Sequence, residues 1–333
     1  MNDIKKFVCI GHVDTGKSCL CGHLLYKCGY VDEHEIDKIR KQAKIDKMEK
    51  WVWSRVLDIY EEEMKRGKTH EYNEINFEKD GKKYQLIDTP GHKSFIRQMI
   101  EGISGNVNIA VLLLSMIDNE FESSFERGML KEHLILARAV GIEHLIIIGN
   151  KMDVIMWDKE ECNKKIKKVM SFIKKKIKWP IKNISIVMMS AFHGIGLTDL
   201  DGIGDEGQWY IKNGGKSFLE CLDQIPITFK SANLVDEEKD NEKDKDTDRF
   251  LAKVMLLGLE NEVVTIGYKC IVHCEKQEFD IEIDQIKKVI IARNGDIIEC
   301  IMKLDKKYII NANAKIIMRK NENTIGYGTI VSL

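Results

Sequence analysis

An apolar run near the N-terminus leads into a glycine-bounded loop and then into a helical pattern. The run is KKFVCI, the loop is GHVDTGKS over residues 11–18, and the helical pattern continues to Lys27. The loop fits G-x-x-x-x-G-K-[ST], whose glycines let the backbone curl until several N–H groups face one bound phosphate. A strand joined to a helix by so tight a turn is typical of a parallel sheet covered by helices. The loop therefore favours an α/β fold built around an anion-binding turn.

The alternation of apolar strands and amphipathic helices continues to about residue 230. Three further runs are almost entirely apolar, as buried parallel strands are: NIAVLLLS (108–115), EHLIIIG (143–149) and ISIVMMS (184–190). Before them, HEYNEINFEK and KKYQLID predict a hairpin across Asp80-Gly81, because Asp-Gly favours a two-residue turn. The remaining segments predict helices, so we expect a mostly parallel sheet with helices on both faces.

The composition changes after residue 232. The stretch VDEEKDNEKDKDTD (235–248) has almost no apolar residue, which predicts a flexible linker and loosely coupled domains. Short strands follow, with a tight hairpin at Asn294-Gly295, and they predict a small antiparallel barrel or sandwich. The expected strands are 250–259, 268–275, 279–286, 287–293, 296–304, 307–314, 315–320 and 324–333. The predicted domains are therefore 1–232 and 249–333, joined by a linker over 233–248.

Charge and cysteine content limit the class of protein. The chain has 333 residues and a net charge of -1, so nothing draws it as a whole to nucleic acid or an anionic membrane. Its nine cysteines form no C-x-x-C pair, which is typical of free thiols in a reducing compartment. The N-terminus lacks the pattern of a signal peptide, and NIAVLLLSMI is too short to span a bilayer. We expect a cytoplasmic protein with no membrane partner.

The glycine loop carries two side chains suited to a nucleoside triphosphate. Lys17 would reach the β- and γ-phosphates, and the Ser18 hydroxyl would ligate Mg²⁺. The motif DTPGH (88–92) places Asp88 at the end of a predicted strand, where it can hold the same ion through water. Gly91 would let a backbone N–H approach the γ-phosphate. Thr69, in RGKTHEY, would add a second hydroxyl to Mg²⁺ when the γ-phosphate is present.

The stretch GNKMDV (149–154) predicts which base is bound. The Asp153 carboxylate can accept hydrogen bonds from guanine N1–H and the exocyclic amine, whereas adenine offers a bare ring nitrogen there. A polar site of this kind discriminates by about 10⁴- to 10⁵-fold. The Lys151 stem can lie over the base, Asn150 can brace the loop, and a backbone N–H of SAF (190–192) can meet guanine O6. The sequence therefore predicts a guanine nucleotide.

Taken in order, GHVDTGKS, RGKT, DTPGH, NKMD and SA resemble the five G motifs of the translational GTPases. The resemblance implies a GTPase with Mg²⁺, GTP as substrate and GDP as product. It assigns the water-orienting role to His92 and a monovalent cation to the neighbourhood of Asp14. The implied nucleotide contacts are Asp14, Thr15, Gly16, Lys17, Ser18, Cys19, Gly91, Asn150, Lys151, Asp153, Ser190, Ala191 and Phe192. The implied metal ligands are Ser18, Thr69 and Asp88, and the implied catalytic residues are His92 and Lys17.

Longer stretches narrow the resemblance to one branch of that family. EEEMKRGKTHEY, DTPGHKSFIRQMI and the region around NKMD are similar to the eukaryotic class II release factor, the ribosome-rescue GTPase and elongation factor 1-alpha. The predicted barrel resembles that branch's third domain, and its second domain is missing between residues 232 and 249. The family's partner-contacting DYPPLGRF-like pattern is also missing, and KYIINANAKIIMRK stands in its place.

These features lead to a first hypothesis of a cytoplasmic GTPase that acts on the ribosome in termination, rescue or elongation. The alternative is a nucleotide-gated binding module that sequesters a release factor, a tRNA or a ribosomal site without productive turnover. An elongation factor that delivers aminoacyl-tRNA is a third hypothesis. Outside the motifs, the lysine-rich segment 164–182 is interpreted as a solvated helix face, with ribosomal RNA contact as the alternative. Trp51 and Trp53 are interpreted as packing residues.

Overall fold

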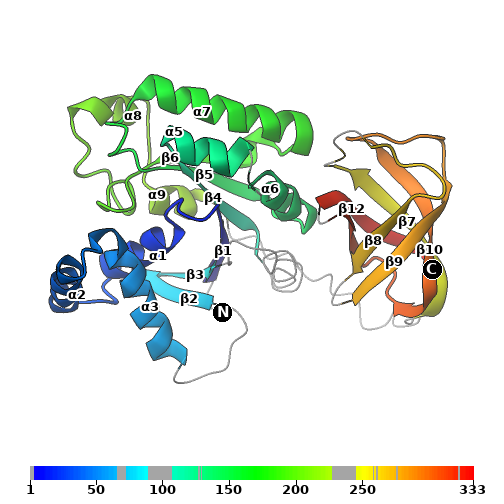
Figure 1. Ribbon diagram of the computed structural model, residues 1–333, viewed down its shortest axis with the longest axis horizontal. Coiled ribbons are helices and arrows are strands. Elements are labelled where there is room, and N and C mark those ends of the chain that lie inside the picture. The colour runs from blue at the N-terminus through cyan, green and yellow to red at the C-terminus, as the bar shows by residue number, and fades with distance from the viewer. Residues whose placement is uncertain are drawn as a thin grey trace.

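The computed structural model consists of an α/β part and a β-barrel beside it (Figure 1). It describes residues 4–65, 73–88, 107–126, 128, 130–226, 245–257, 259, 262–274, 277–321 and 323–333, without the side chains of 61–65, 73, 88, 245 and 246. Thr69, Gly91 and His92 lie outside the described residues, as does the predicted linker up to residue 244. No helix in these ranges is long and apolar enough to cross a membrane.

The α/β part is built on a six-stranded sheet in the order β2-β3-β1-β4-β5-β6. All neighbouring pairs are parallel except the hairpin β2–β3. At that hairpin Asp80 and Gly81 both have positive φ, as the predicted turn requires. The strands are β1 (Ile4–Ile10), β2 (Asn73–Lys79), β3 (Lys82–Asp88), β4 (Ile109–Ser115), β5 (His144–Asn150) and β6 (Ile184–Met188).

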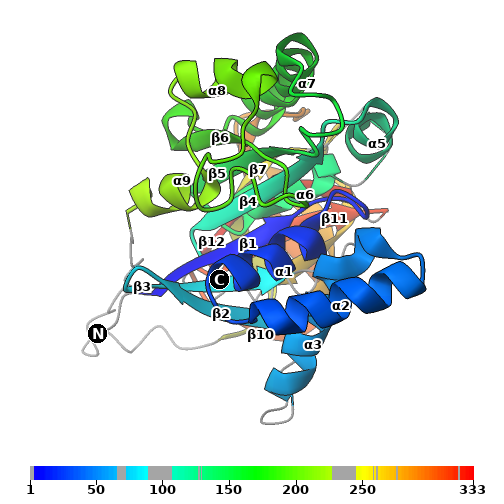
Figure 2. The same ribbon diagram turned by 90° about the vertical axis from the view of Figure 1, so that its left-hand side faces the viewer.

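Helices cover both faces of this sheet (Figure 2). Apolar residues of α1, α3 and α9 pack on one face, and those of α6 and α7 pack on the other. The helices are α1 (Lys17–Lys27), α2 (Glu33–Ile45), α3 (Val52–Lys65), α5 (Asp118–Phe121), α6 (Leu130–Ala139), α7 (Lys159–Phe172), α8 (Gln208–Lys212) and α9 (Phe218–Gln224). Short helical turns are η1 (Glu49–Trp51), η2 (Glu122–Glu126), η3 (Ile173–Ile177), η4 (Ile181–Asn183) and η5 (Asp205–Gly207). Strand β4 is buried along its whole length, and burial on both faces explains why all its residues except Ser115 are apolar.

The second part is a closed barrel in the order β10-β7-β12-β11-β8-β9. Buried and exposed side chains alternate along its strands, which places one row of each strand in the barrel core. The strands are β7 (Lys245–Leu256), β8 (Lys269–Cys274), β9 (Gln277–Ile286), β10 (Ile297–Ile310), β11 (Lys315–Lys320) and β12 (Asn323–Ser332). The predicted fold class, an α/β domain followed by an antiparallel barrel, is therefore confirmed. Strand β7 begins at Lys245, inside the stretch predicted as linker.

Two strand predictions in the barrel are wrong. Residues 287–293 were expected to form a strand, but only Ala292 makes a bridge, to Val264, and Ile290 is 84% exposed. The six-stranded ring is already closed without this segment, so no strand edge is left to pair it. The segments 296–304 and 307–314 were expected as two strands, but 297–304 and 307–310 lie in the single strand β10, whose pairing with β7 shifts register between Lys303 and Tyr308. A bulge there keeps one strand continuous across polar residues.

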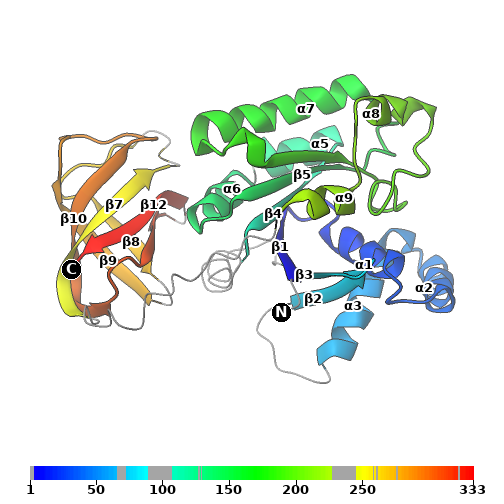
Figure 3. The ribbon, with the colours of Figure 1, turned by 180° about the vertical axis from the view of Figure 1, so that it is seen from behind.

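The expectation of loosely coupled domains is also wrong. Strand β12 packs on α6 (Figure 3). There the Thr324 backbone N–H donates to Glu132 Oε1 at 2.7 Å. Leu257 and Ile317 of the barrel part are buried in one hydrophobic cluster with residues of the sheet and α6. Lys315 Nζ also donates to Val140 O at 3.2 Å. The two parts therefore share a packed interface, whatever the path of the chain between them.

Replacing Glu132 with glutamine will test the electrostatics of this interface. Burial raises the pKa of Glu132, so the folded protein disfavours its charged form. The Glu132 carboxyl group therefore loses its proton at lower pH in the unfolded chain than in the folded protein. As a result, the contribution of Glu132 to stability falls as the pH rises through the raised pKa. Glutamine keeps the acceptor for Thr324. We expect Glu132→Gln to be as stable as wild type at pH 4 and more stable at pH 8.

Thermal unfolding of the two proteins across this pH range checks the prediction. Glu122→Gln, an exposed site on η2, is the matched control and should leave the pH dependence unchanged. A lower stability of Glu132→Gln at pH 8 would show that the carboxylate charge holds the interface together.

Candidate functional site

The glycine loop between β1 and α1 has a backbone shape that depends on glycine. Gly16 caps α1 with φ 96°, and a Cβ there would stand 2.4 Å from Asn150 Nδ2. Gly11 is equally confined, because a Cβ there would stand 2.7 Å from Thr15 Oγ1. Asp14 has φ 66° and is exposed on the loop. Side chains at the two glycines would therefore open the loop or push it away from Asn150.

The start of α1 is suited to an anion. Its first turn has neither an acidic residue nor a side-chain cap, so its N–H groups and the helix dipole are directed at whatever the loop encloses. Lys17 is folded over the loop, where its Nζ donates to Gly11 O at 2.6 Å and to His12 O at 2.8 Å. Thr15 Oγ1 donates to the same His12 carbonyl at 2.8 Å. These bonds place the lysine ammonium at the centre of the loop.

Two of the predicted magnesium ligands lie at one edge of the sheet by their position in the chain. Strand β1 pairs with β3 so that Cys9 lies opposite Asp88, and β1 leads through the glycine loop to Ser18 in the first turn of α1. Hydroxyl and carboxylate groups are ligands that Mg²⁺ prefers. Thr69, the third predicted ligand, and the catalytic residue His92 are outside the described residues.

Asn150 joins the glycine loop to the turn after β6. Its Nδ2 donates to Thr15 O at 2.8 Å, and its Oδ1 accepts from the Ala191 N–H at 2.9 Å. The side chain is only 2% exposed, so both bonds are shielded from water. Asn150 therefore has the geometry of a brace between two loops that are far apart in the sequence.

Lys151 and Asp153 follow on the loop after β5. Lys151 has φ 66°, and its Nζ lies 2.6 Å from Glu120 Oε2, which orients its alkyl stem. Asp153 has a side chain 27% exposed, and its Oδ2 lies 3.7 Å from His193 Nε2. The Asp153 carboxylate thus stands at the protein surface with one weak partner, where it can accept from a ligand.

The turn after β6 contains the predicted residues Ser190, Ala191 and Phe192. Ser190 closes the turn by exchanging two backbone hydrogen bonds with Ile195. Ala191 presents its N–H to Asn150, and its carbonyl lies 2.8 Å from His23 Nδ1. Cys19 lies near Lys151 and Asp153, and burial raises the pKa of its thiol to about 12, so it contributes packing as a neutral group.

Three residues of this region were missed by sequence reasoning. Glu120, on α5, pairs with Lys151, and His23 and Trp53 contact the turn from α1 and α3. No motif contains them, and each contact spans at least 31 residues of sequence. Only the placement of His23 on a predicted helix next to the glycine loop gave a signal. Trp51 and Trp53 were both predicted to pack; Trp53 is 3% exposed, but Trp51 is 55% exposed, so the prediction is wrong for Trp51.

Burial of His23 predicts a pH dependence of stability. Burial lowers the pKa of His23 from 6.5 to about 4, because a charged imidazole would lose its hydration. The unfolded chain therefore binds a proton between these values that the folded protein does not bind. The contribution of His23 to stability is complete above pH 6.5 and falls by about 3 kcal/mol as the pH drops to 4.

Urea unfolding of wild type and His23→Asn at several pH values between 4 and 7 measures this contribution. The difference between the two curves isolates His23 from other buried histidines such as His133, whose pKa is also lowered. Parallel curves would contradict the assignment.

Comparison with known proteins shows the family. Residues 2–237 match the family of the elongation factor Tu GTP binding domain. The chain belongs to the translational GTPase family. The resemblance seen in its G motifs is thereby confirmed. This family member is 38% identical over 231 residues to the GTP-binding subunit of the eukaryotic peptide chain release factor of Schizosaccharomyces pombe, covering 68% of the chain and 34% of that protein. The same subunit of Kluyveromyces lactis is 35% identical over 235 residues, covering 69% and 33%.

The chain spans about a third of the length of these curated relatives. Its whole fold, barrel included, is similar to the GTPase-like domain of S. cerevisiae Ski7, which has been solved with GTP and with GDP and inorganic phosphate. The TM-scores are 0.73 and 0.72, and each alignment covers 98% of this chain and 97% of the other at 14% and 15% identity. This similarity concerns the fold alone.

Proposed function

We propose that this translational GTPase family member binds GTP with Mg²⁺ in the cytoplasm and hydrolyses it to GDP and phosphate on the ribosome. The observation that carries the proposal is the brace by Asn150, which joins the phosphate loop to the predicted base site. One side chain thereby holds the two halves of a nucleotide site in register. Asp153 beside it is placed to accept guanine N1–H and the exocyclic amine, and the Lys151 stem to cover the base.

The chemistry is attack of water on the γ-phosphate. Lys17 stands where its charge can offset the charge that develops on the phosphate oxygens. Ser18, Asp88 and Thr69 would hold Mg²⁺, which when bound adds positive charge at the phosphates. Asp14, exposed on the loop, is where we place a monovalent cation. His92 would orient the attacking water.

GTP turnover measured with and without ribosomes tests this function. GTPases that lack a supplied arginine turn over at roughly 10⁻⁴ s⁻¹. We expect a rate of this order for the free protein and a large increase with ribosomes, which His92→Ala abolishes while GTP still binds. No turnover above background with ribosomes would exclude the enzymatic function.

A nucleotide-gated binding module is the second candidate. It is favoured by the whole-length similarity to a domain described as GTPase-like and solved with GTP. In that case, the chain would hold a release factor, a tRNA or a ribosomal site in one nucleotide state without productive turnover. Binding to purified ribosomes with GTP, GDP or no nucleotide separates the two functions. Binding that ignores the nucleotide would exclude this candidate.

A further inference from the structure

We propose that His23 and Trp53 are positioning residues for guanine binding, which hold the turn 190–192 from outside the family motifs. This inference rests on the proposed nucleotide function. His23 is on α1, the helix that follows the phosphate loop, and Trp53 is in the first turn of α3. Both side chains donate to consecutive carbonyls of the turn.

The His23 ring is fixed by three contacts. Its Nδ1 lies 2.8 Å from Ala191 O, and because a carbonyl can only accept, Nδ1 carries the proton. The ring stacks on Trp53 with centroids 3.6 Å apart and planes 13° from parallel. It also fits closely against Gly194, where a Cβ would stand 2.6 Å from His23 Nε2. The ring is 4% exposed, so its tautomer and orientation are set by the protein.

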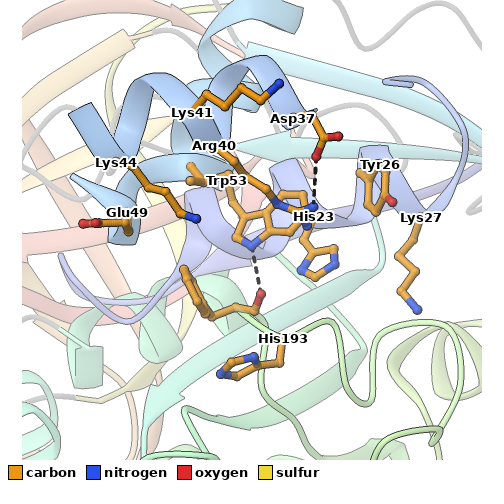
Figure 4. Close-up of a pocket in the computed structure, with 12 residues that line it drawn as sticks. His23, Tyr26, Lys27, Asp37, Arg40, Lys41, Lys44, Glu49, Trp53 and His193 are labelled. Atoms are coloured by element: carbon orange, nitrogen blue, oxygen red, sulfur yellow. Dashed lines mark hydrogen bonds and ion pairs between the residues drawn. The ribbon is translucent and has the colours of Figure 1, made fainter. Parts of the chain in front are cut away.

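Trp53 provides the second donor. Its Nε1–H donates to Phe192 O at 2.8 Å (Figure 4). A cavity of about 610 Å³ opens beside this bond, between α1, α2, α3 and the turn. Phe192, which is 40% exposed, faces this cavity, whereas Ser190 and Ala191 are fully buried, so the two hydrogen bonds act together with packing to fix the turn.

Holding two consecutive carbonyls also fixes the donors of the turn. The Ala191 carbonyl and the Phe192 N–H belong to one planar peptide, and the Phe192 carbonyl and the His193 N–H belong to the next. His23 and Trp53 therefore set the directions of both N–H groups. Asn150 holds the Ala191 N–H from the other side. The His193 N–H already donates to Ser190 Oγ at 3.4 Å, so the Phe192 N–H is the donor that the turn offers to the base edge. Its preorganised direction lowers the ordering cost of binding.

Four substitutions and three ligands test the positioning role. In His23→Asn the amide Nδ2 occupies the place of Nδ1 and can donate to Ala191, whereas His23→Gln carries its amide one carbon further out. His23→Leu removes the donor, and Trp53→Phe removes the Nε1–H donor and one of the two fused rings while keeping an aromatic ring. Calorimetric Kd values are measured for GDP, ADP and pyrophosphate, and GDP dissociation rates by fluorescence. Pyrophosphate reports on the phosphate loop without the base.

We expect His23→Asn to bind GDP within about threefold of wild type. His23→Gln, His23→Leu and Trp53→Phe should each raise the Kd for GDP about fivefold or more, the factor for one lost hydrogen bond, and speed GDP release. Their Kd for pyrophosphate should stay within about twofold of wild type. A purely structural role would instead weaken pyrophosphate as much as GDP, or would leave asparagine and glutamine equivalent at position 23, and either result overturns the proposal.

The wild-type measurements separate this inference from the proposed function. If wild type binds ADP as tightly as GDP, the protein does not recognise guanine, and the positioning role is excluded as well. Wild type that prefers GDP, together with unchanged GDP affinity in His23→Gln and Trp53→Phe, overturns the positioning role alone.

Discussion

Asp153→Asn is expected to lower the affinity for GDP by about 10²- to 10⁴-fold and to raise the affinity for xanthosine diphosphate. The carboxylate of Asp153 would accept two hydrogen bonds from guanine, each charge-assisted and worth about 1.5–3 kcal/mol. An amide keeps one acceptor but turns a donor toward the exocyclic amine of guanine. Xanthine carries a carbonyl in place of that amine, so the amide suits xanthine instead.

Equilibrium titration with GDP, xanthosine diphosphate and ADP checks this result. Asp158→Asn is a matched control, because Asp158 lies five positions further on and caps α7 by accepting from the Glu161 N–H at 2.9 Å, a role that asparagine also fills. The control should bind GDP as wild type does. If Asp153→Asn keeps the wild-type preference for GDP, the base site has been placed wrongly.

Asn150→Asp is expected to weaken every nucleotide by about 100-fold or more. The new carboxylate keeps the acceptor for the Ala191 N–H but turns an oxygen toward Thr15 O, 2.8 Å from the present Nδ2. The site is 2% exposed, so the lost bond and the buried charge together cost about 3 kcal/mol or more. The phosphate loop and the base loop should then lose their common brace, and both pyrophosphate and GDP should bind more weakly.

Lowering the pH tests whether the lost hydrogen bond to Thr15 causes the weaker binding of Asn150→Asp. A protonated carboxyl regains an O–H that can donate to Thr15, so the GDP affinity of Asn150→Asp should recover as the pH falls from 8 to 5.5. Asn183→Asp is the matched control: Asn183 Nδ2 donates to the Glu143 carbonyl at 3.1 Å, away from the site. Its GDP affinity should follow wild type. An Asn150→Asp protein with wild-type affinity at pH 8 would show that the brace is not needed for binding.

Local sequence patterns correctly predicted the elements in which the hydrophobic periodicity and the turn residues indicate the same structure. Asp80-Gly81 joins β2 to β3 as expected, and the apolar run 109–114 lies in β4. The failures lie in the barrel, at 287–293 and along β10. An apolar, β-branched segment such as VIIA forms a strand only where a neighbouring strand has free N–H and C=O groups, and that depends on how the ring closes.

The residues of the candidate site also fall into a group that the sequence predicted and a group that only the structure revealed. The motifs predicted that Lys17, Asn150 and Asp153 would lie together. A glycine loop and a polar stretch that each follow a strand of the same parallel sheet lie at the same edge of that sheet. The partners that hold them, Glu120, His23 and Trp53, carry no local signature. Each acts through a single contact made by a distant element, and many other side chains at those positions would suit the same helices.

The sequence by itself determined the fold class, the family and the choice of guanine, because these depend on backbone patterns and on chemical groups at short, fixed spacings. Only the tertiary structure decided how the loops are braced and that the barrel packs on α6, because hydrogen bonds and apolar contacts between distant segments arise when the chain closes on itself. Asn150 depends on both: its motif predicted that it belongs to the site, but its two hydrogen-bond partners became known only from the packing of β1, β4, β5 and β6 into one sheet.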